Sequence, residues 1–150
     1  MIQLAPVQTL QRIFAENHTI AVVGLSPKIN RPSNQVALYL QQAGYRIIPV
    51  NPGQAEILGE PCYPDLQSIP EPVDVVDIFR RSEHVEPVVR DAIAIGAKVV
   101  WMQQGIVNVE AATIAEQAGL SVIMDRCMKV DHRQFTRGQK PEDRGQNLEL

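Results

Sequence analysis

The chain has 150 residues, a length that suits a single domain with a substantial apolar core. Its formal net charge of −3 at pH 7 argues against the broad basic surface that nucleic acids and anionic membranes attract, so neither is expected as a partner. The two cysteines, Cys62 and Cys127, are far apart, which argues against the disulfide framework of small secreted domains and favours a reducing cytoplasm.

The predicted elements alternate between helices and strands along the chain. A covering helix is expected at residues 7–15. Apolar runs rich in β-branched residues predict strands at residues 19–23, 46–50, 73–79, 98–102 and 121–124. Apolar residues at helical spacing, each set followed by a glycine that can end a helix, predict three helices. These run from Pro32 to just before Gly44, from Val85 to just before Gly96, and from Val109 to Ala118. This alternation is typical of an α/β fold, here a Rossmann-like, doubly wound sheet of about five mainly parallel strands with helices on both faces.

Three stretches depart from the regular pattern. Pro49 lacks the N–H that an inner strand requires, so either the second strand stops early or the nitrogen faces away from a neighbour. Residues 54–72, which are rich in proline, predict an excursion with at most a short strand near Ile57 and a helical turn near Leu66. Residues 137–150 are polar and predict a flexible tail, which leaves residues 1–136 as a single folded domain.

The loop after the first predicted strand combines several features of an anion site. It leads into a helix N-terminus and supplies a glycine, two hydroxyls and two cations: Gly24, Ser26, Ser33, Lys28 and Arg31. Backbone N–H groups and the helix dipole favour a phosphate at such a point, and the cations add charge. Each residue alone is compatible with an ordinary structural role, such as a tight turn or a helix cap. Their coincidence after the first strand predicts a phosphate-bearing ligand.

The same loop lacks two well-known nucleotide fingerprints. Nicotinamide dinucleotide sites use G-x-G-x-x-G and an acidic residue about 20 positions further on. Only Gly24 of the three glycines is present, and the second strand is followed by Asn51 and Pro52 where an acid would stand. No G-x-x-x-x-G-K-[ST] sequence occurs, which excludes a Walker A loop.

Other candidate contacts follow the later strands. An adenine ring needs flat apolar contacts, and a pantetheine arm needs an apolar groove with amide-matching groups. Phe79, Trp101 and Gln103 suit these roles, although both aromatic rings could instead pack in the core. Arg80 is the better of two adjacent arginines to face the ligand, and it could also be solvated. Cys127 is compatible with a buried thiol in a salt-bridged turn or, alternatively, with a reactive thiol.

Six short segments, in their order and spacing, resemble one known family. They are residues 21–26, 31–33, 48–52, 74–79, 100–106 and 125–127. The chain resembles the small stand-alone CoA-binding proteins and is similar to the N-terminal CoA-binding domain of the succinyl-CoA synthetase alpha subunit. The resemblance implies coenzyme A as the ligand, which the residues alone do not distinguish from another nucleotide.

The resemblance also implies a set of binding residues at the carboxyl ends of the strands. The phosphate end of CoA would contact the first loop, at Gly24, Ser26, Lys28, Arg31 and Ser33. The second strand would contribute Asn51 and Pro52 to the cleft. The other half would contribute Phe79, Arg80, Trp101, Gln103 and Gly105.

These inferences predict a CoA- or acyl-CoA-binding carrier, sensor or accessory module without a complete active site. The synthetase subunit has a second domain with a phosphorylated histidine, which this chain is too short to contain. His18, His84 and His132 lack a catalytic partner at motif spacing, so an enzyme is not expected. Two alternatives remain: an NADP-dependent oxidoreductase whose Arg31 accepts a 2′-phosphate, and a thiol-redox protein that uses Cys127.

Overall fold

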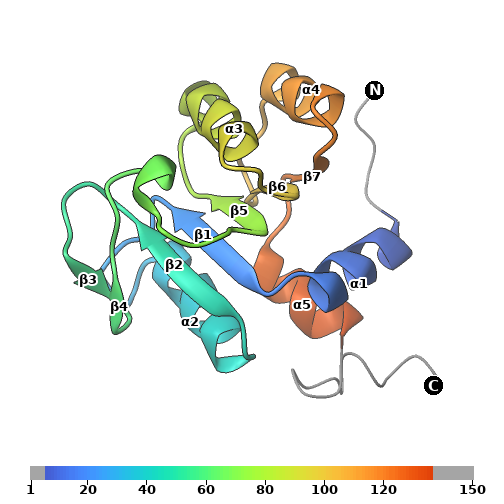
Figure 1. Ribbon diagram of the computed structural model, residues 1–150. Coiled ribbons are helices and arrows are strands. Elements are labelled where there is room, and N and C mark those ends of the chain that lie inside the picture. The colour runs from blue at the N-terminus through green and yellow to red at the C-terminus, as the bar shows by residue number, and fades with distance from the viewer. Residues whose placement is uncertain (1–5, 137–150) are drawn as a thin grey trace.

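A five-stranded parallel sheet forms the centre of the computed structural model, which describes residues 6–136 (Figure 1). Its strands are β1 (Thr19–Val23), β2 (Arg46–Val50), β5 (Val75–Ile78), β6 (Val99–Met102) and β7 (Ser121–Met124). They lie in the order β2-β1-β5-β6-β7, and each neighbouring pair is parallel. All the predicted strands are confirmed, although β5 and β6 are shorter than the apolar runs that contain them.

Helices cover both faces of this sheet. One face packs against α1 (Val7–Glu16), α2 (Pro32–Gln42) and α5 (Met128–Phe135), and the other against α3 (Val85–Ala94) and α4 (Val109–Gln117). Successive strand residues alternate between the two core clusters, as Val22 and Val23 do, because side chains along a strand point to opposite faces. The predicted Rossmann-like α/β fold is therefore confirmed.

Helix α5 is the element that the sequence pattern did not predict. The sequence indicates only a turn after the fifth strand, whereas a helix begins at Met128. The buried positions of this helix are Met128, Asp131 and His132, so no apolar stripe marks it. Asp131 instead accepts hydrogen bonds of 2.6 and 2.9 Å from Arg126, and His132 Nδ1 lies 2.8 Å from the Tyr39 hydroxyl. Polar and aromatic contacts thus hold α5 in place.

Pro49 lies inside β2, at the edge of the sheet beside β1. Its carbonyl accepts a hydrogen bond of 3.0 Å from the Tyr63 N–H on the outer side, so its nitrogen faces away from β1 and the strand does not stop early. The excursion that follows contains β3 (Glu56–Ile57), β4 (Glu60–Pro61) and the 3-10 turn η1 (Leu66–Ser68). The short strand near Ile57 and the helical turn near Leu66 are thereby confirmed.

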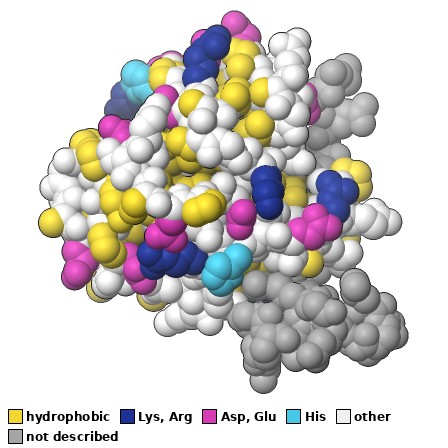
Figure 2. Space-filling view, in the orientation of Figure 1, with side chains coloured by type: hydrophobic (Ala, Val, Ile, Leu, Met, Phe, Trp, Pro, Cys, Tyr) yellow, Lys and Arg dark blue, Asp and Glu magenta, His cyan; other side chains and the backbone are white. Residues whose placement is uncertain are grey.

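The surface mixes both signs of charge, as Figure 2 shows for one face of the molecule. Acidic and basic side chains alternate there without a broad basic patch. No helix within residues 6–136 is long and apolar enough to cross a membrane. The tail predicted at residues 137–150 lies outside the described residues.

Candidate ligand-binding site

The winding of the sheet reverses between β1 and β5. From β1 the chain passes through α2 to β2 on one side, and β5 later pairs with the other side of β1. In open parallel sheets this reversal leaves a crevice beyond the carboxyl ends of the two strands, where ligands bind. Gly24 and Phe79 immediately follow these strands and lie at that crevice.

Gly24 allows the two strand ends to approach closely. Its φ of +89° is a left-handed conformation that favours glycine, and a Cβ at this position would collide with the Phe79 carbonyl. The Gly24 N–H donates to the Val50 carbonyl at 2.9 Å, and the Phe79 N–H donates to the Val23 carbonyl at 2.8 Å. A residue with a side chain would therefore displace the start of the loop.

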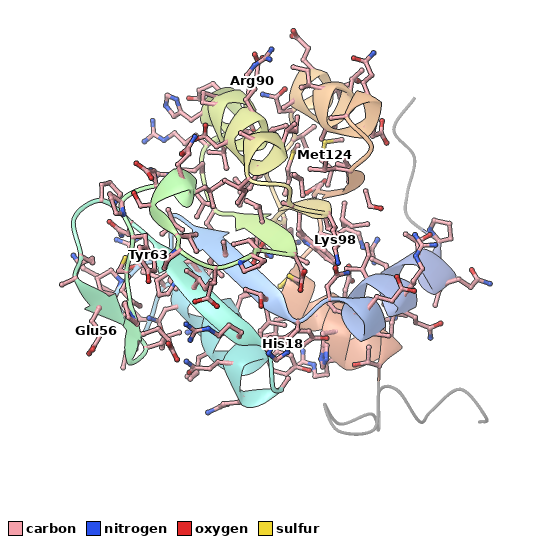
Figure 3. The ribbon with its side chains drawn as sticks, in the orientation of Figure 1. His18, Glu56, Tyr63, Arg90, Lys98 and Met124 are labelled. Atoms are coloured by element: carbon pink, nitrogen blue, oxygen red, sulfur yellow. The ribbon has the colours of Figure 1, made fainter. Side chains whose placement is uncertain are left out.

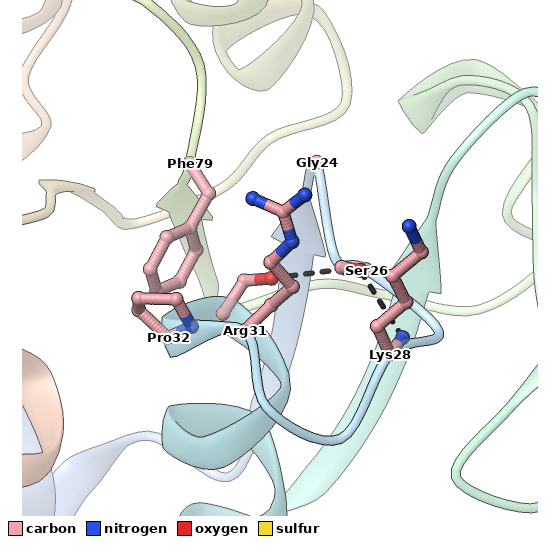
Figure 4. Close-up of a pocket in the computed structure, with 7 residues that line it drawn as sticks. Gly24, Ser26, Lys28, Arg31, Pro32 and Phe79 are labelled. Carbon is pink, nitrogen blue, oxygen red and sulfur yellow. Dashed lines mark hydrogen bonds between the residues drawn. The ribbon is translucent and has the colours of Figure 1, made fainter.

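The loop between Gly24 and α2 is held by hydrogen bonds among its own residues. Ser33 Oγ accepts from the Ser26 N–H at 2.9 Å, and Ser26 Oγ accepts from the Lys28 N–H at 3.1 Å (Figure 4). The Asn34 side-chain amide also donates to the Ser26 carbonyl at 2.9 Å. Because both hydroxyls act as acceptors in these bonds, their O–H groups can donate to a ligand.

The first turn of α2 offers backbone N–H groups to the same region. Arg31 is the N-cap residue and its side chain makes no capping bond. The first backbone bond of the helix runs from the Gln35 N–H to the Arg31 carbonyl at 3.1 Å, so the N–H groups of Ser33 and Asn34 have no intrahelical acceptor. An anion here would meet two amides and the positive end of the helix dipole.

These groups line a pocket of about 420 Å³ beyond β1 and β5 (Figure 4). Its lining residues are Gly24, Ser26, Lys28, Arg31, Pro32, Ser33 and Phe79. Lys28 and Arg31 are exposed, and neither has an ion-pair partner within the described part of the chain. The Phe79 ring lies beside Pro32 and gives the pocket an apolar wall. We call this the phosphate pocket.

The phosphate pocket gathers six residues that the sequence singled out, five from the first loop and one from the end of β5. Pro32 is the lining residue that the sequence reasoning missed. A proline in the first turn of a helix has a sufficient conformational explanation, so its ring attracted no functional role. Because Pro32 lies between two predicted site residues, Arg31 and Ser33, its position in the sequence could have indicated that it lines the pocket.

Two of the predicted site residues lie in the core instead. Trp101 is fully buried, with its ring 5.6 Å from that of Phe14, and its Nε1 donates to the Arg126 carbonyl at 2.8 Å. Gln103 is 3% exposed and donates to Asp77 Oδ1 at 2.7 Å. Neither side chain lines the phosphate pocket, and the Trp101 ring packs in the core cluster that includes Phe14.

Four other predicted residues lie near the carboxyl edge without lining the phosphate pocket. The Asn51 side chain donates to the Leu25 carbonyl of the neighbouring loop and accepts from the Gly53 N–H of its own loop, both at 2.9 Å, and Pro52 beside it is exposed. The Gly105 N–H donates to the Asp125 carboxylate at 2.7 Å, which ties the loop after β6 to the end of β7. Arg80 lines a separate pocket on the α3 face.

Asp77 is a buried acid that the sequence reasoning read only as part of a strand. It lies in β5, opposite Val22 of β1 and Trp101 of β6, and its side chain is completely buried. Its Oδ2 atom has no hydrogen-bond partner among the described residues. Desolvation raises the pKa of this carboxyl to about 7, although the hydrogen bond from Gln103 opposes the shift.

Neither cysteine thiol, of Cys62 or of Cys127, lines the phosphate pocket. The imidazole of His18 also lies away from it. Cys62 is half-buried and donates to the Asn51 carbonyl at 3.4 Å, and burial raises the pKa of its thiol. Cys127 is half-buried just before α5. His18 precedes β1 at the amino edge of the sheet, opposite the pocket (Figure 3). The pocket lining therefore gives no support to the thiol-redox alternative.

Comparisons with known proteins show relatives that share most of this chain. The uncharacterized protein YneT of Bacillus subtilis (strain 168) is 44% identical over 123 residues, which cover 82% of this chain and 91% of YneT. A hypothetical protein from Pyrococcus horikoshii OT3 is 38% identical, with a TM-score of 0.85 over 91% of this chain and 99% of that one. The Pyrococcus horikoshii protein therefore shares the fold described above over nearly its full length.

A longer relative and a match to a family model show which family the chain belongs to. The acetate–CoA ligase (ADP-forming) I of Archaeoglobus fulgidus is 28% identical over 129 residues, which cover 79% of this chain and 19% of the ligase. Residues 18–133 match the family described as CoA binding domain. The resemblance read from the sequence is thereby confirmed, and the chain belongs to the CoA-binding-domain family.

Proposed function

We propose that this protein binds coenzyme A or an acyl-CoA, with the phosphates of the ligand in the phosphate pocket. The observation that carries the proposal is a convergence of groups at the point where the sheet reverses its winding: two cations without an ion pair to a described residue, two hydroxyls, and a helix start without a side-chain cap. Membership of the CoA-binding-domain family favours CoA over other phosphate-bearing nucleotides.

The polar side of the pocket suits a pyrophosphate. Hydrogen bonds from Lys28 and Arg31 to phosphate oxygens would be charge-assisted, and bonds of this kind contribute about 1.5–3 kcal/mol. The O–H groups of Ser26 and Ser33 and the amides of the first helical turn can add neutral donors. Because the whole chain carries a net charge of −3, this local arrangement must supply the attraction for an anion.

The apolar side of the pocket indicates a ligand larger than inorganic phosphate. Phe79 and Pro32 form a wall that a free phosphate ion would leave unused. Small-molecule sites commonly combine an apolar surface with a few placed polar groups. A polyanion joined to less polar groups, as in CoA, uses both sides.

The role that we propose is that of a carrier, sensor or accessory module rather than a complete enzyme. The side chains that most often transfer protons or form covalent intermediates are imidazoles, carboxylates and thiols. The described lining of the phosphate pocket contains none of these groups. Such a site binds CoA and presents it to another protein.

Calorimetric titration of the purified protein with CoA, dephospho-CoA, NADP and NAD tests the proposal. CoA should bind most tightly, because it combines the pyrophosphate with a 3′-phosphate and a pantetheine arm. A preference for NADP would favour the oxidoreductase alternative, in which Arg31 contacts the 2′-phosphate. The absence of measurable CoA binding would refute the proposed function.

A further inference from the structure

Asp77 is a completely buried carboxyl in the central strand of the sheet, and the binding site described above does not use it. It lies in β5 between Val22 of β1 and Trp101 of β6. Its Oδ1 accepts a hydrogen bond of 2.7 Å from Gln103, whereas its Oδ2 has no hydrogen-bond partner among the described residues. A carboxyl held in this way is costly to ionise, because burial removes the water that would stabilise its charge.

Asp77 also lies close to the phosphate pocket. Phe79, two residues further along the chain, lines the pocket, and Gly24, two residues beyond Val22, begins its loop. Residues in a strand rise about 3.3 Å and neighbouring strands lie about 4.8 Å apart, so the backbones of Asp77 and Gly24 are about 8 Å apart. Because side chains alternate along a strand, Asp77 points to the same face as Phe79, which is the face that α2 covers. A phosphate in the pocket would therefore lie on the same side of the sheet as the buried carboxyl.

Other titratable or charged groups face this side of the sheet from α2, α5 and the segments beside them: Tyr39, Tyr45, Arg126, Cys127, Lys129, Asp131 and His132. Arg126 and Asp131 form an ion pair of 2.6 Å, and on α1 both Arg12 and Glu16 are exposed. Burial raises the pKa of Asp77 to about 7 against the hydrogen bond from Gln103, without a contribution from a charged group among residues 6–136. The charge of a bound phosphate would be a new influence on this carboxyl.

The phosphates of a ligand would favour the protonated form of Asp77. A like charge disfavours the ionised form of a carboxyl, and a protein interior weakens this repulsion less than water does. Lys28 and Arg31 oppose the repulsion, but both line the pocket before the ligand enters, so the change on binding comes from the phosphates.

We propose that CoA binding is coupled to protonation of Asp77, so that a proton passes from solvent to Oδ2 of this residue when the phosphates occupy the phosphate pocket. The inference rests on the proposed function and adds a pH control of the same site. Because the coupling is reciprocal, protonation of Asp77 also favours binding. The affinity should fall as the pH rises above about 7, because the ionised free protein must then gain a proton in order to bind.

Calorimetric titration with dephospho-CoA tests the coupling, because this ligand lacks the phosphate monoester whose own pKa lies near 6. Asp77→Asn is a neutral copy of the protonated side chain. The wild type should bind at least threefold more weakly at pH 8 than at pH 6, and Asp77→Asn should lose clearly less affinity. In two buffers of different ionisation enthalpy at pH 7.5, the wild type should take up more protons on binding than Asp77→Asn does. Glu116→Gln, which removes an exposed carboxyl of α4 on the other face of the sheet, is the control and should behave as the wild type does.

If Asp77→Asn does not fold, carbon-13 NMR of the wild-type Asp77 carboxyl measures the coupling directly. The midpoint of its titration should move to higher pH when dephospho-CoA is bound. An unchanged or lowered midpoint would overturn the inference, and so would equal proton uptake by the wild type and Asp77→Asn. In both cases binding of the ligand by the wild type would leave the proposed function intact, whereas no binding of CoA or dephospho-CoA at any pH would end both.

Discussion

Lys28 and Arg31 are exposed cations beside the first turn of α2, and neither forms an ion pair with a described residue. Side chains of this kind contribute little to the stability of the fold, because they bury little surface and stabilise no other charge. Their contribution should therefore appear in ligand binding. This separation makes them suitable positions for testing the phosphate pocket.

Replacing Lys28 or Arg31 with alanine should weaken CoA binding by about 1–3 kcal/mol each, which is roughly 5- to 150-fold, through the loss of a charge-assisted phosphate contact. Calorimetric titration measures the change, and the melting temperature should stay within error of the wild type. Arg133→Ala, an exposed arginine on α5, is the control and should bind CoA normally. Undiminished affinity in both variants would mean that the pocket has been misassigned.

Asp77 should make stability depend on pH. Its pKa of about 7 in the folded state lies above the usual value near 3.9, so the folded state holds the proton more tightly than the unfolded chain. The stability from this group is present below about pH 4 and is lost as the pH rises to about 7. Between pH 5 and pH 8 the loss is on the order of 2–3 kcal/mol.

Asp77→Asn cannot ionise, so it should lack this loss. Urea unfolding of both proteins at pH 5 and pH 8 provides the free energies of unfolding. The wild type should lose more stability than the variant between these pH values, because all other titrating groups are common to both. Parallel changes in the two proteins would show that the Asp77 carboxyl does not titrate in this range.

Among the helices and strands, the ones with a clear pattern of apolar residues are predictable from the sequence. The runs that became β1, β2 and β7 have the predicted bounds, and α2 begins at the predicted proline. Helix α5 was not predictable in this way, because it is held by the bonds of Asp131 and the ring contacts of His132 rather than by an apolar stripe. The ring contacts of His132 with Phe14 and Tyr39 join residues far apart in the chain, so local patterning does not reveal them.

Gly24 connects β1, β5 and the loop to α2, and its replacement tests that connection. Gly24→Ala should destabilise the protein by about 1–3 kcal/mol or more, because the left-handed φ is strained for alanine and the Cβ would strike the Phe79 carbonyl. Gly119→Ala is the control, because its φ of +92° is similar but no atom lies within 4 Å of a Cβ there. Thermal or urea unfolding measures both variants.

A clearly larger loss for Gly24→Ala than for Gly119→Ala would identify the contact between strand ends as the cause. Equal losses would mean that the left-handed backbone alone accounts for both. The comparison therefore separates backbone strain from the close approach of β1 and β5.

At the scale of the molecule, one edge of the sheet carries both the phosphate pocket and the separate pocket that Arg80 lines. The site residues of the first loop could be predicted because they lie within ten consecutive residues, where a strand end, cations and a helix start are visible together. Site residues at the ends of the later strands were harder to predict, because the sequence indicates the strand but not the face of the sheet to which each side chain points. Phe79 and Arg80 are adjacent yet line different pockets, and Trp101 faces the core.

A crystal structure of the protein with CoA tests the central claim most directly. The account predicts pyrophosphate oxygens within hydrogen-bond distance of the Ser33 amide and of at least one of the cations Lys28 and Arg31. CoA bound with its phosphates elsewhere, and the phosphate pocket filled only by solvent, would contradict it.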